Sequence, residues 1–348
     1  MPIMGVADAP IKAGTRVLMR VDFNVPLAVD GSISDDKRMT DSLPTVKYCL
    51  ERGAKVILCS HFGRPDGKPE PEYSLRPVYA HLKKLLPGVV VEFATETVGA
   101  AVEKQVAALP DGAVLLLENT RFAAGETAND PAFARQLANL GDIFVNDAFG
   151  TAHRAHASTV GVADYLPSYA GLLMAREITY LSQITEHPKR PFTVIIGGKK
   201  ASDKLPLARK LADVADYLLV GGRIAQEWQE DGVKHRAQIS IAPDQGLDIS
   251  PATVEAWRPI IESSATIFWN GPLGQFDVDP QNAAGTNAVA KLVSASKAVS
   301  VVGGGDTAAA VKDFQFTHVS TGGGAALEFV EGATLPGIAC LRKKGDQK

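Results

Sequence analysis

Short runs rich in Val, Ile and Leu alternate with longer amphipathic segments from one end of the chain to the other. The runs with strand character lie at 16–22, 55–60, 89–93, 113–118, 142–146, 193–197, 217–221, 266–270, 298–303 and 317–320. The segments with helical periodicity include 41–52, 74–86, 129–139, 203–213, 251–262 and 283–296. Because strands that alternate with helices pair in parallel and carry helices on both faces, the sequence predicts an α/β protein with doubly wound parallel sheets.

The length of the chain indicates more than one such sheet. At roughly 150 residues per domain, 348 residues predict two domains. The segment 171–190 has the pattern of a helix between the two halves and ends at His187-Pro188, so we expect it to connect them.

Composition and charge exclude several classes of protein. Hydrophobic residues make up 45% and charged residues 22%, which excludes a disordered chain and a disulfide scaffold. The net charge of -3 gives no general attraction to nucleic acid or anionic lipid, so we expect neither partner. The three cysteines have no C-x-x-C spacing, and no signal peptide or apolar run of about 18 residues occurs, so we expect a cytoplasmic protein.

Cationic side chains follow several strands of the first half. Ligands of open parallel sheets bind at the carboxyl ends of the strands, and the groups expected to meet there are Arg38, His61, Arg64, Arg121 and Arg154. Any one of them alone could be a solvated loop residue. Together they would repel one another without an anion, so the set predicts a site for phosphate or carboxylate. The pair His153 and His156 has no carboxylate or cysteine at ligand spacing, which argues against a metal site.

Glycine-rich turns occupy the same topological place in the second half. They lie at 197–204, 221–222, 270–271, 303–307 and 321–324. Backbone N–H groups at such turns favour phosphate, and Asp306 adds a carboxylate for Mg²⁺. The P-loop pattern and a G-x-G-x-x-G fingerprint are both absent, so a nicotinamide dehydrogenase remains only a general α/β analogy.

Eight motifs, read in order, resemble the signatures of the phosphoglycerate kinase family. They are RVDFNVP, SHFGRP, ENTRF, NDAFGTAHRAHAST, GGKKASDK, FWNGPLG, VGGGDTAAA and STGGGAALE. The resemblance covers nearly the whole chain and implies two doubly wound lobes that face each other across a cleft. It implies an N-lobe at 1–170 with the tail at about 331–348 packed back on it, a hinge helix at 171–190, and a C-lobe at 191–330.

The resemblance also implies the substrates and the residues that bind them. The N-lobe would bind 3-phosphoglycerate or 1,3-bisphosphoglycerate through Asp22, Asn24, Arg38, His61, Arg64, Arg121 and Arg154. The C-lobe would bind Mg-ADP or Mg-ATP through Gly198, Lys200, Lys204, Gly222, Leu247, Asn270, Asp277, Gly303, Gly304, Gly305, Asp306 and Thr307. Asp306 would hold Mg²⁺, and Arg38, Lys200 and Lys204 would stabilise the transition state. The expected activity is reversible transfer of a phosphoryl group between 1,3-bisphosphoglycerate and ADP in glycolysis, by a monomer.

The chain departs from the family pattern at four places on the nucleotide side. Arg223 replaces a glycine, Gln275 replaces a small apolar residue, and Asp277 replaces a longer acid. Between about 232 and 246 the chain lacks on the order of fifty residues, including a helix and a strand. These departures leave a second hypothesis open, that of a weakly active or non-catalytic paralogue that keeps the N-lobe as an anion-binding or regulatory module.

Overall fold

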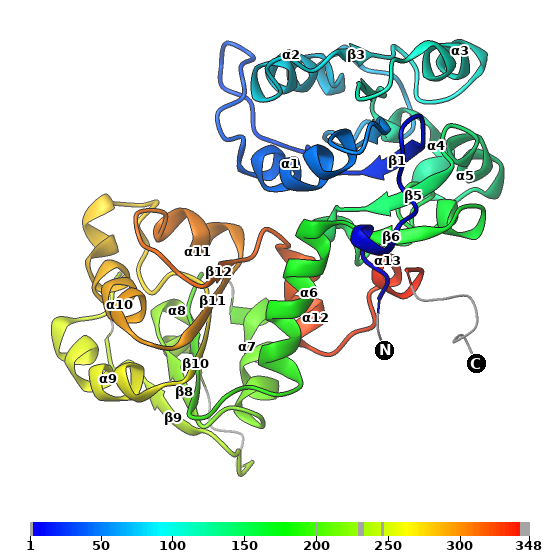
Figure 1. Ribbon diagram of the computed structural model, residues 1–348. Helices are drawn as coiled ribbons and strands as arrows, with labels where there is room; N and C mark the ends of the chain where they lie inside the picture. The colour runs from blue at the N-terminus through cyan, green and yellow to red at the C-terminus, as the bar shows by residue number, and fades with distance from the viewer. Residues whose placement is uncertain (1–2, 200, 229–232, 245–246, 342–348) are drawn as a thin grey trace. The chain divides into compact units, whose positions relative to one another are not determined.

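The computed structural model describes residues 3–199, 201–228, 233–244 and 247–341, which divide into two compact units. Unit 1 contains the described residues of Met1–Arg176 and Thr334–Lys348, and unit 2 is Glu177–Ala333. Each unit is built on one six-stranded parallel sheet (Figure 1). Within the described ranges, no helix has the length and apolar character needed to cross a membrane.

The sheet of unit 1 has the strand order β3-β4-β2-β1-β5-β6. Its strands are β1 (Arg16–Arg20), β2 (Lys55–Cys59), β3 (Val91–Phe93), β4 (Val114–Leu116), β5 (Ile143–Asn146) and β6 (Ser168–Ala170). Its longer helices are α1 (Lys37–Leu50), α2 (Arg76–Leu85), α3 (Ala100–Ala108) and α5 (Pro131–Ala138). The shorter ones are α4 (Ala124–Thr127), α13 (Pro336–Ala339) and the 3-10 turn η3 (Thr120–Phe122). Strand β1 pairs with both β2 and β5, so their ends lie side by side at one edge.

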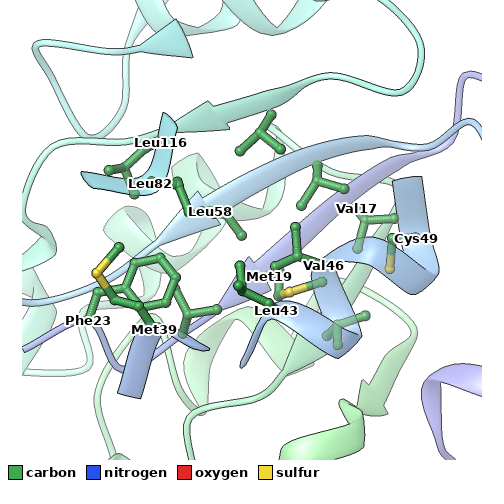
Figure 2. Close-up of a cluster of buried hydrophobic side chains, with 14 of the residues drawn as sticks. Val17, Met19, Phe23, Met39, Leu43, Val46, Cys49, Leu58, Leu82 and Leu116 are labelled. Atoms are coloured by element: carbon green, nitrogen blue, oxygen red, sulfur yellow. The ribbon is translucent and has the colours of Figure 1, made fainter. Parts of the chain in front are cut away.

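Alternate residues of each strand enter two separate cores. Val17 and Met19 of β1 face α1 and α2, where they pack in one cluster with Met39 and Val46 (Figure 2). Leu18, which lies between them in sequence, packs in the other cluster with residues of α3 and α5. Strands that are buried on both faces need continuous apolar runs, which explains the Val, Ile and Leu runs of the sequence. Each fully buried aliphatic side chain of this kind contributes roughly 1.5–3 kcal/mol relative to an exposed one.

The sheet of unit 2 has the strand order β12-β11-β10-β7-β8-β9. Its strands are β7 (Phe192–Ile196), β8 (Tyr217–Val220), β9 (Gln238–Ile241), β10 (Thr266–Asn270), β11 (Val299–Gly303) and β12 (His318–Val319). Its helices are α7 (Ala201–Ala212), α8 (Gly222–Glu227), α9 (Pro251–Ser263), α10 (Ala284–Ala295), α11 (Gly305–Ala310) and α12 (Gly324–Val330). One face of the sheet packs on α9 and α10 through Trp257, Ile261 and Val289.

Helix α6 (Leu172–Thr185) begins in unit 1 and continues into unit 2. At its start, Oδ1 of the buried Asp147 accepts hydrogen bonds from the backbone N–H groups of Leu173 and Met174, at 2.9 and 3.1 Å. Further along, the buried Glu177 bonds to Nε2 of His318 at 2.9 Å and to the N–H of Thr321 at 2.8 Å. The first turn of the helix is therefore held by the buried carboxylate of Asp147, and the helix itself contributes a second buried carboxylate, that of Glu177.

Two strands were not predicted from the sequence. Strand β6 has only three residues and no Val, Ile or Leu among them, and β9 is an edge strand with the mixed sequence QISI. Helix α1 begins at Lys37, four residues before the predicted 41, and so includes Arg38 in its first turn. Helix α6 ends at Thr185, before the predicted limit at 190.

Candidate active site

Four neighbouring elements of unit 1 present polar groups at one edge of the sheet. Asp22 and Asn24 follow β1, His61 follows β2, Arg121 lies in η3 after β4, and the loop after β5 carries Arg154. Because β4, β2, β1 and β5 are consecutive in the sheet, their carboxyl ends meet. Arg38 comes from the first turn of α1, and the exposed Arg64 from the segment after β2.

Hydrogen bonds connect these residues directly. Nη1 of Arg38 donates to Oδ2 of Asp22 at 3.1 Å and to the carbonyl of Asn24 at 3.2 Å. Oδ1 of Asn24 accepts from the N–H of Gly63 at 3.0 Å, and Nη1 of Arg121 donates to the carbonyl of Gly63 at 2.7 Å. The segment around Gly63 is thus held from both sides by residues of the predicted site.

The charges of this cluster are mutually unfavourable. Burial, together with the neighbouring Arg154 and Arg20, lowers the pKa of Arg121 to about 10. Burial and the charges of Arg20, Arg121, Arg154 and Arg38 lower the pKa of His61 well below its usual value. Among the described residues, Nε of Arg121 is buried without a hydrogen-bond partner. A bound anion would relieve this repulsion, as expected for a site that binds phosphate or carboxylate.

Sequence reasoning missed three buried polar residues behind this cluster. Arg20 is 1% exposed, and its Nε donates to Oγ of Ser158 at 2.8 Å. Ser158 in turn donates from Oγ to Oε1 of Glu126 at 2.6 Å, and both residues are fully buried. The one available signal was the arginine inside the apolar run RVLMRVD, because a charged residue within a buried strand requires a partner.

The predicted nucleotide-binding residues of unit 2 also meet at one sheet edge. Strands β8, β7, β10 and β11 are consecutive in the sheet and end next to Gly221, Gly197, Gly271 and Gly304. A Cβ on Gly271 would lie 1.9 Å from the carbonyl oxygen of Gly197, so only glycine allows the two turns to approach. Nζ of Lys204 donates to the same Gly197 carbonyl at 3.1 Å, which brings this lysine to the edge. The neighbouring Gly198 and Gly222 both have positive φ.

Asn270 and Thr307 tie the remaining turns together. Nδ2 of Asn270 donates to the carbonyl of Gly303 at 2.9 Å, and the N–H of Gly271 donates to Oγ1 of Thr307 at 2.7 Å. Oδ1 of Asn270 is buried and has no hydrogen-bond partner in the described part of the chain. This unused acceptor and the turn at 303–305 indicate a place for a polar ligand.

The residues present fit a magnesium-bound nucleotide. Asp306 is exposed in the first turn of α11, and a Cβ on the preceding Gly305 would meet nothing within 4 Å. A carboxylate is a ligand that Mg²⁺ prefers, and Mg²⁺ usually takes only one or two carboxylates beside phosphate oxygens. Among the described residues no group of three His, Cys, Asp or Glu could hold a metal without such help.

Other predicted nucleotide-side residues have different surroundings. Lys200 lies outside the described residues. Asp277 is exposed and forms an ion pair with Lys199, and Leu247 is 49% exposed. Arg223 points its Nε to Oε1 of Glu227, four residues on, at 2.7 Å. This salt bridge holds Arg223, one of the four departures from the family pattern, against its own helix.

Comparisons with known proteins agree over nearly the whole chain. A sequence model of the family described as phosphoglycerate kinase matches residues 6–238 and 229–333. The phosphoglycerate kinase of Chloroflexus aggregans is 45% identical over 387 residues, which cover 95% of this chain and 96% of that protein. The phosphoglycerate kinase of Fervidobacterium nodosum is 43% identical over 404 residues, and the alignment covers 100% of both chains. The structure of phosphoglycerate kinase from Coxiella burnetii matches with a TM-score of 0.82 and 34% identity, over 98% of this chain and 99% of that one.

The comparisons also agree with a shortened second unit. The alignment with the Fervidobacterium nodosum protein has 404 positions, 56 more than the 348 residues of this chain. The family model matches in two ranges that overlap at 229–238. The described residues of unit 2 nevertheless form six strands, as many as those of unit 1.

Proposed function

The chain belongs to the phosphoglycerate kinase family, and we propose that the cationic edge of unit 1 binds the glycerate substrate and the glycine-lined edge of unit 2 binds the nucleotide. The family reaction is the reversible transfer of a phosphoryl group between 1,3-bisphosphoglycerate and ADP in glycolysis. The enzyme is therefore a phosphotransferase whose phosphoryl acceptor in the reverse direction is a carboxyl group.

The observation that carries the assignment of unit 1 is its unbalanced positive charge. Asp22 is the acid bonded to Arg38, whereas the charge of Arg154 lowers the pKa of both Arg121 and His61. A phosphorylated glycerate carries a carboxylate and a phosphate, so it supplies negative charge at two points. Guanidinium groups bind both kinds of oxygen in a bidentate manner, which favours arginine here.

The reaction itself needs positioning and neutralisation rather than a nucleophilic side chain. In the direction of ATP synthesis, the bond between phosphorus and the acyl oxygen breaks, and a bond forms between phosphorus and an oxygen of the ADP β-phosphate. The negative charge left on the glycerate carboxylate meets Arg38 in this proposal, and the moving phosphoryl oxygens meet Lys204 and Lys200. Such in-line transfers depend on alignment and on cationic groups that stabilise the transition state.

Asp306 is the residue we assign to Mg²⁺, which when bound neutralises charge on the nucleotide phosphates. The N–H groups of the 303–305 turn fit the phosphate oxygens of the nucleotide, which accept hydrogen bonds. Asp277 remains our candidate for the ribose, provided that its ion pair with Lys199 opens when the nucleotide binds.

We propose that the enzyme works in the cytoplasm, as a monomer. The cysteines that the structure describes, Cys49, Cys59 and Cys340, are free thiols, as a reducing cytoplasm permits. Burial raises the pKa of each thiol to about 12, which makes them unreactive. One chain supplies both candidate substrate sites, so we propose that the enzyme acts as a monomer on small molecules and on neither nucleic acid nor membranes.

A coupled assay of ATP formation from 1,3-bisphosphoglycerate and ADP tests this function. We expect turnover with Mg²⁺, loss of turnover with EDTA, and a fall of at least about 100-fold in kcat for Asp306→Asn. Glu331→Gln, a change at a partly exposed position elsewhere in unit 2, is the control and should keep full activity. If Asp306→Asn retains wild-type activity at saturating Mg²⁺, the assignment of Asp306 is wrong.

The shortened second unit favours keeping one alternative, a weakly active paralogue that only binds anions. Calorimetry with 3-phosphoglycerate separates the two hypotheses. Normal binding of 3-phosphoglycerate together with background turnover for every nucleoside diphosphate would establish the binding module instead of the enzyme.

A further inference from the structure

Behind His61, a continuous row of buried polar groups runs from the site to the interior of unit 1. Nη2 of Arg20 lies 3.1 Å from Nδ1 of His61, and Nε of the same guanidinium donates to Oγ of Ser158 at 2.8 Å. Ser158 donates to Oε1 of Glu126 at 2.6 Å, and its backbone N–H donates to Oε2 at 3.0 Å. Arg20, Ser158 and Glu126 are all at most 1% exposed, and His61 is 5% exposed.

Each contact in this row has only one direction. A guanidinium has donors and no acceptor, so Arg20 must donate both to Ser158 and to His61. Nδ1 of His61 must therefore accept with its lone pair. A neutral imidazole with an acceptor at one nitrogen carries its hydrogen on the other, which here is Nε2.

The opposite tautomer would conflict with the geometry. A hydrogen on Nδ1 would point at the hydrogen of Arg20 Nη2, and the nearest carboxylate oxygen, Oδ1 of Asp22, is 3.8 Å away, beyond hydrogen-bond distance. Nε2 makes no hydrogen bond within the described parts of the chain, so its hydrogen remains available to a ligand.

Glu126 gives the row its orientation. Its two carboxylate oxygens accept hydrogen bonds from the N–H and Oγ of Ser158 and from Oγ1 of Thr120, the last at 3.3 Å. Since the Ser158 hydroxyl hydrogen is committed to Glu126, its lone pair can face Arg20. Glu126 also supplies a buried negative charge in the row that ends at the Arg20 guanidinium, which lowers the cost of burying that cation.

We propose that Arg20, held by Ser158 and Glu126, is a positioning residue that fixes His61 as a neutral imidazole with its hydrogen on Nε2, aimed at the bound glycerate. This proposal rests on the assignment of the glycerate to unit 1. The groups that face His61 are Arg20 from β1, Asp22 after it, Arg38 from α1, Arg121 from η3, and Arg154. The cations outnumber the single acid, so His61 stays neutral, and between pH 5 and 8 the binding of the glycerate changes only through the second ionisation of its own phosphate, at about pH 6.

The tautomer can be read directly by NMR. In wild-type protein labelled with ¹⁵N-histidine, with the His61 signals assigned from His61→Gln, we expect a protonated Nε2 and an unprotonated Nδ1 that do not change between pH 5 and 8. A hydrogen on Nδ1, or a doubly protonated ring at pH 6, would overturn the proposal. This measurement does not depend on turnover, and the tautomer is read in the wild-type protein, so it stands even if the proposed function fails.

Variants then test whether Arg20 and its support cause this state. Ser158→Ala removes the hydroxyl that holds Arg20, and Arg20→Gln removes the charge that opposes protonation of His61. For both variants we expect a mixture of tautomers and a dissociation constant for 3-phosphoglycerate raised about tenfold at pH 8. For Arg20→Gln we also expect binding to become tighter, relative to the wild type, as the pH falls toward 6.

Thr151→Val is the matched control, since Thr151 is a buried hydroxyl of unit 1 that bonds to the carbonyl of Ala148 and to no member of the row. It should leave the tautomer and the pH profile unchanged. The row variants could instead lose affinity while keeping the wild-type tautomer and the wild-type dependence of the dissociation constant on pH. That result would show that the row is only structural, and it would contradict the proposal.

Discussion

The guanidinium of Arg121 lies among other cations and is almost completely buried, with one side fixed on the carbonyl of Gly63. Arg38 differs in both respects, because its side chain is 39% exposed and its Nη1 bonds to Asp22. A buried, fixed cation meets the charge that the glycerate already has when it binds. A more exposed cation on a flexible side chain can follow charge that develops during transfer.

Arg121→Ala and Arg38→Ala should therefore affect different kinetic constants. We expect Arg121→Ala mainly to raise the KM and the dissociation constant for 3-phosphoglycerate, and Arg38→Ala mainly to lower kcat. Each change should correspond to a loss of about 2–4 kcal/mol of binding or transition-state free energy. Steady-state kinetics together with calorimetry measure the two effects. Arg52→Ala, which changes an exposed arginine of unit 1, is the control, and equal changes in kcat and KM for both site variants would defeat the distinction.

The meeting of the cations that we assign to the substrate could be predicted from the sequence, whereas the residues that organise them could not. Arg38, His61, Arg64, Arg121 and Arg154 follow strands or start helices, so topology alone brings them together. Glu126 and Ser158 instead meet Arg20 because a loop after β5 packs beside α4, and neither periodicity nor strand order fixes that packing. Pairing of buried charges depends on three-dimensional packing at the scale of single side chains.

At the scale of elements, the start of helix α6 depends on one buried acid. Asp147 follows β5 and accepts two N–H groups of the first turn of α6, while burial raises its pKa to about 7. The folded state therefore resists ionisation of Asp147, whereas in the unfolded chain the carboxyl ionises near its ordinary pKa of 3.8. The stability that Asp147 gives is complete below about pH 4 and is lost as the pH rises toward 7.

Asp147→Asn should keep the acceptor and remove this dependence on pH. We expect the variant to gain stability relative to the wild type, and the gain to be larger at pH 8 than at pH 5 by about 2–3 kcal/mol. Urea denaturation at the two pH values measures it, and Asp111→Asn, at an exposed position, is the control. A gain that does not differ between pH 5 and pH 8 would mean that Asp147 is charged at both.

Helix α8 bears on the choice of nucleotide base. Arg223 forms an i,i+4 salt bridge with Glu227, and its side chain is 60% exposed. Gln275, which is partly buried, is therefore the departure from the family pattern that we expect to face the nucleotide base. The backbone N–H of Gln275 is held by the carbonyl of Leu247 at 2.8 Å. The sequence predicts the shortened segment in the same part of the chain, at about 232–246.

We expect GDP to be used with a kcat/KM within about tenfold of that for ADP, a difference of no more than roughly 1.4 kcal/mol. Gln275→Val should change this ratio, while Arg223→Gly should leave it within about twofold of the wild-type value. Initial rates with ADP, GDP and IDP for the three proteins decide the point. A hundredfold preference for ADP that Gln275→Val does not alter would refute a role for Gln275.

The main elements of both sheets could be predicted because doubly buried strands need apolar runs. Ten of these runs contain a strand, from β1 at 16–22 to β12 at 317–320. The short strand β6 gave no such signal because its three buried residues include no Val, Ile or Leu, and β9 gave none because this edge strand is not fully buried and does not need a long apolar run. Sequence therefore predicts the centre of a parallel sheet better than its edges.

At the scale of the whole molecule, the glycerate and nucleotide sites that we propose belong to different units. Direct transfer requires the reacting atoms to come within about 3–3.5 Å. We therefore expect the two units to close when both substrates are bound, with the change in backbone located near 171–190 and 318–324.

Small-angle scattering should show this closure as a smaller radius of gyration with both substrates than with either one alone. Mg-ADP together with 3-phosphoglycerate is a suitable pair, since it does not turn over. The Arg121→Ala variant, in which glycerate binding is weakened, should require more 3-phosphoglycerate for the same change. An unchanged radius of gyration at saturation of both sites would contradict closure.

The return of the chain to unit 1 has a consequence for synthesis on the ribosome. The N–H of Gly337 donates to the carbonyl of Ala152 at 2.8 Å, and Nδ2 of Asn146 donates to the carbonyl of Gly337 at 3.2 Å. About 160 residues separate Arg176 from this segment, which corresponds to roughly 8–30 s of translation at 5–20 residues per second. During that interval the loop that carries Arg154 lacks the hydrogen bond from Gly337 to Ala152. We therefore expect the nascent chain to form its anion site last, after all of unit 2 has been translated.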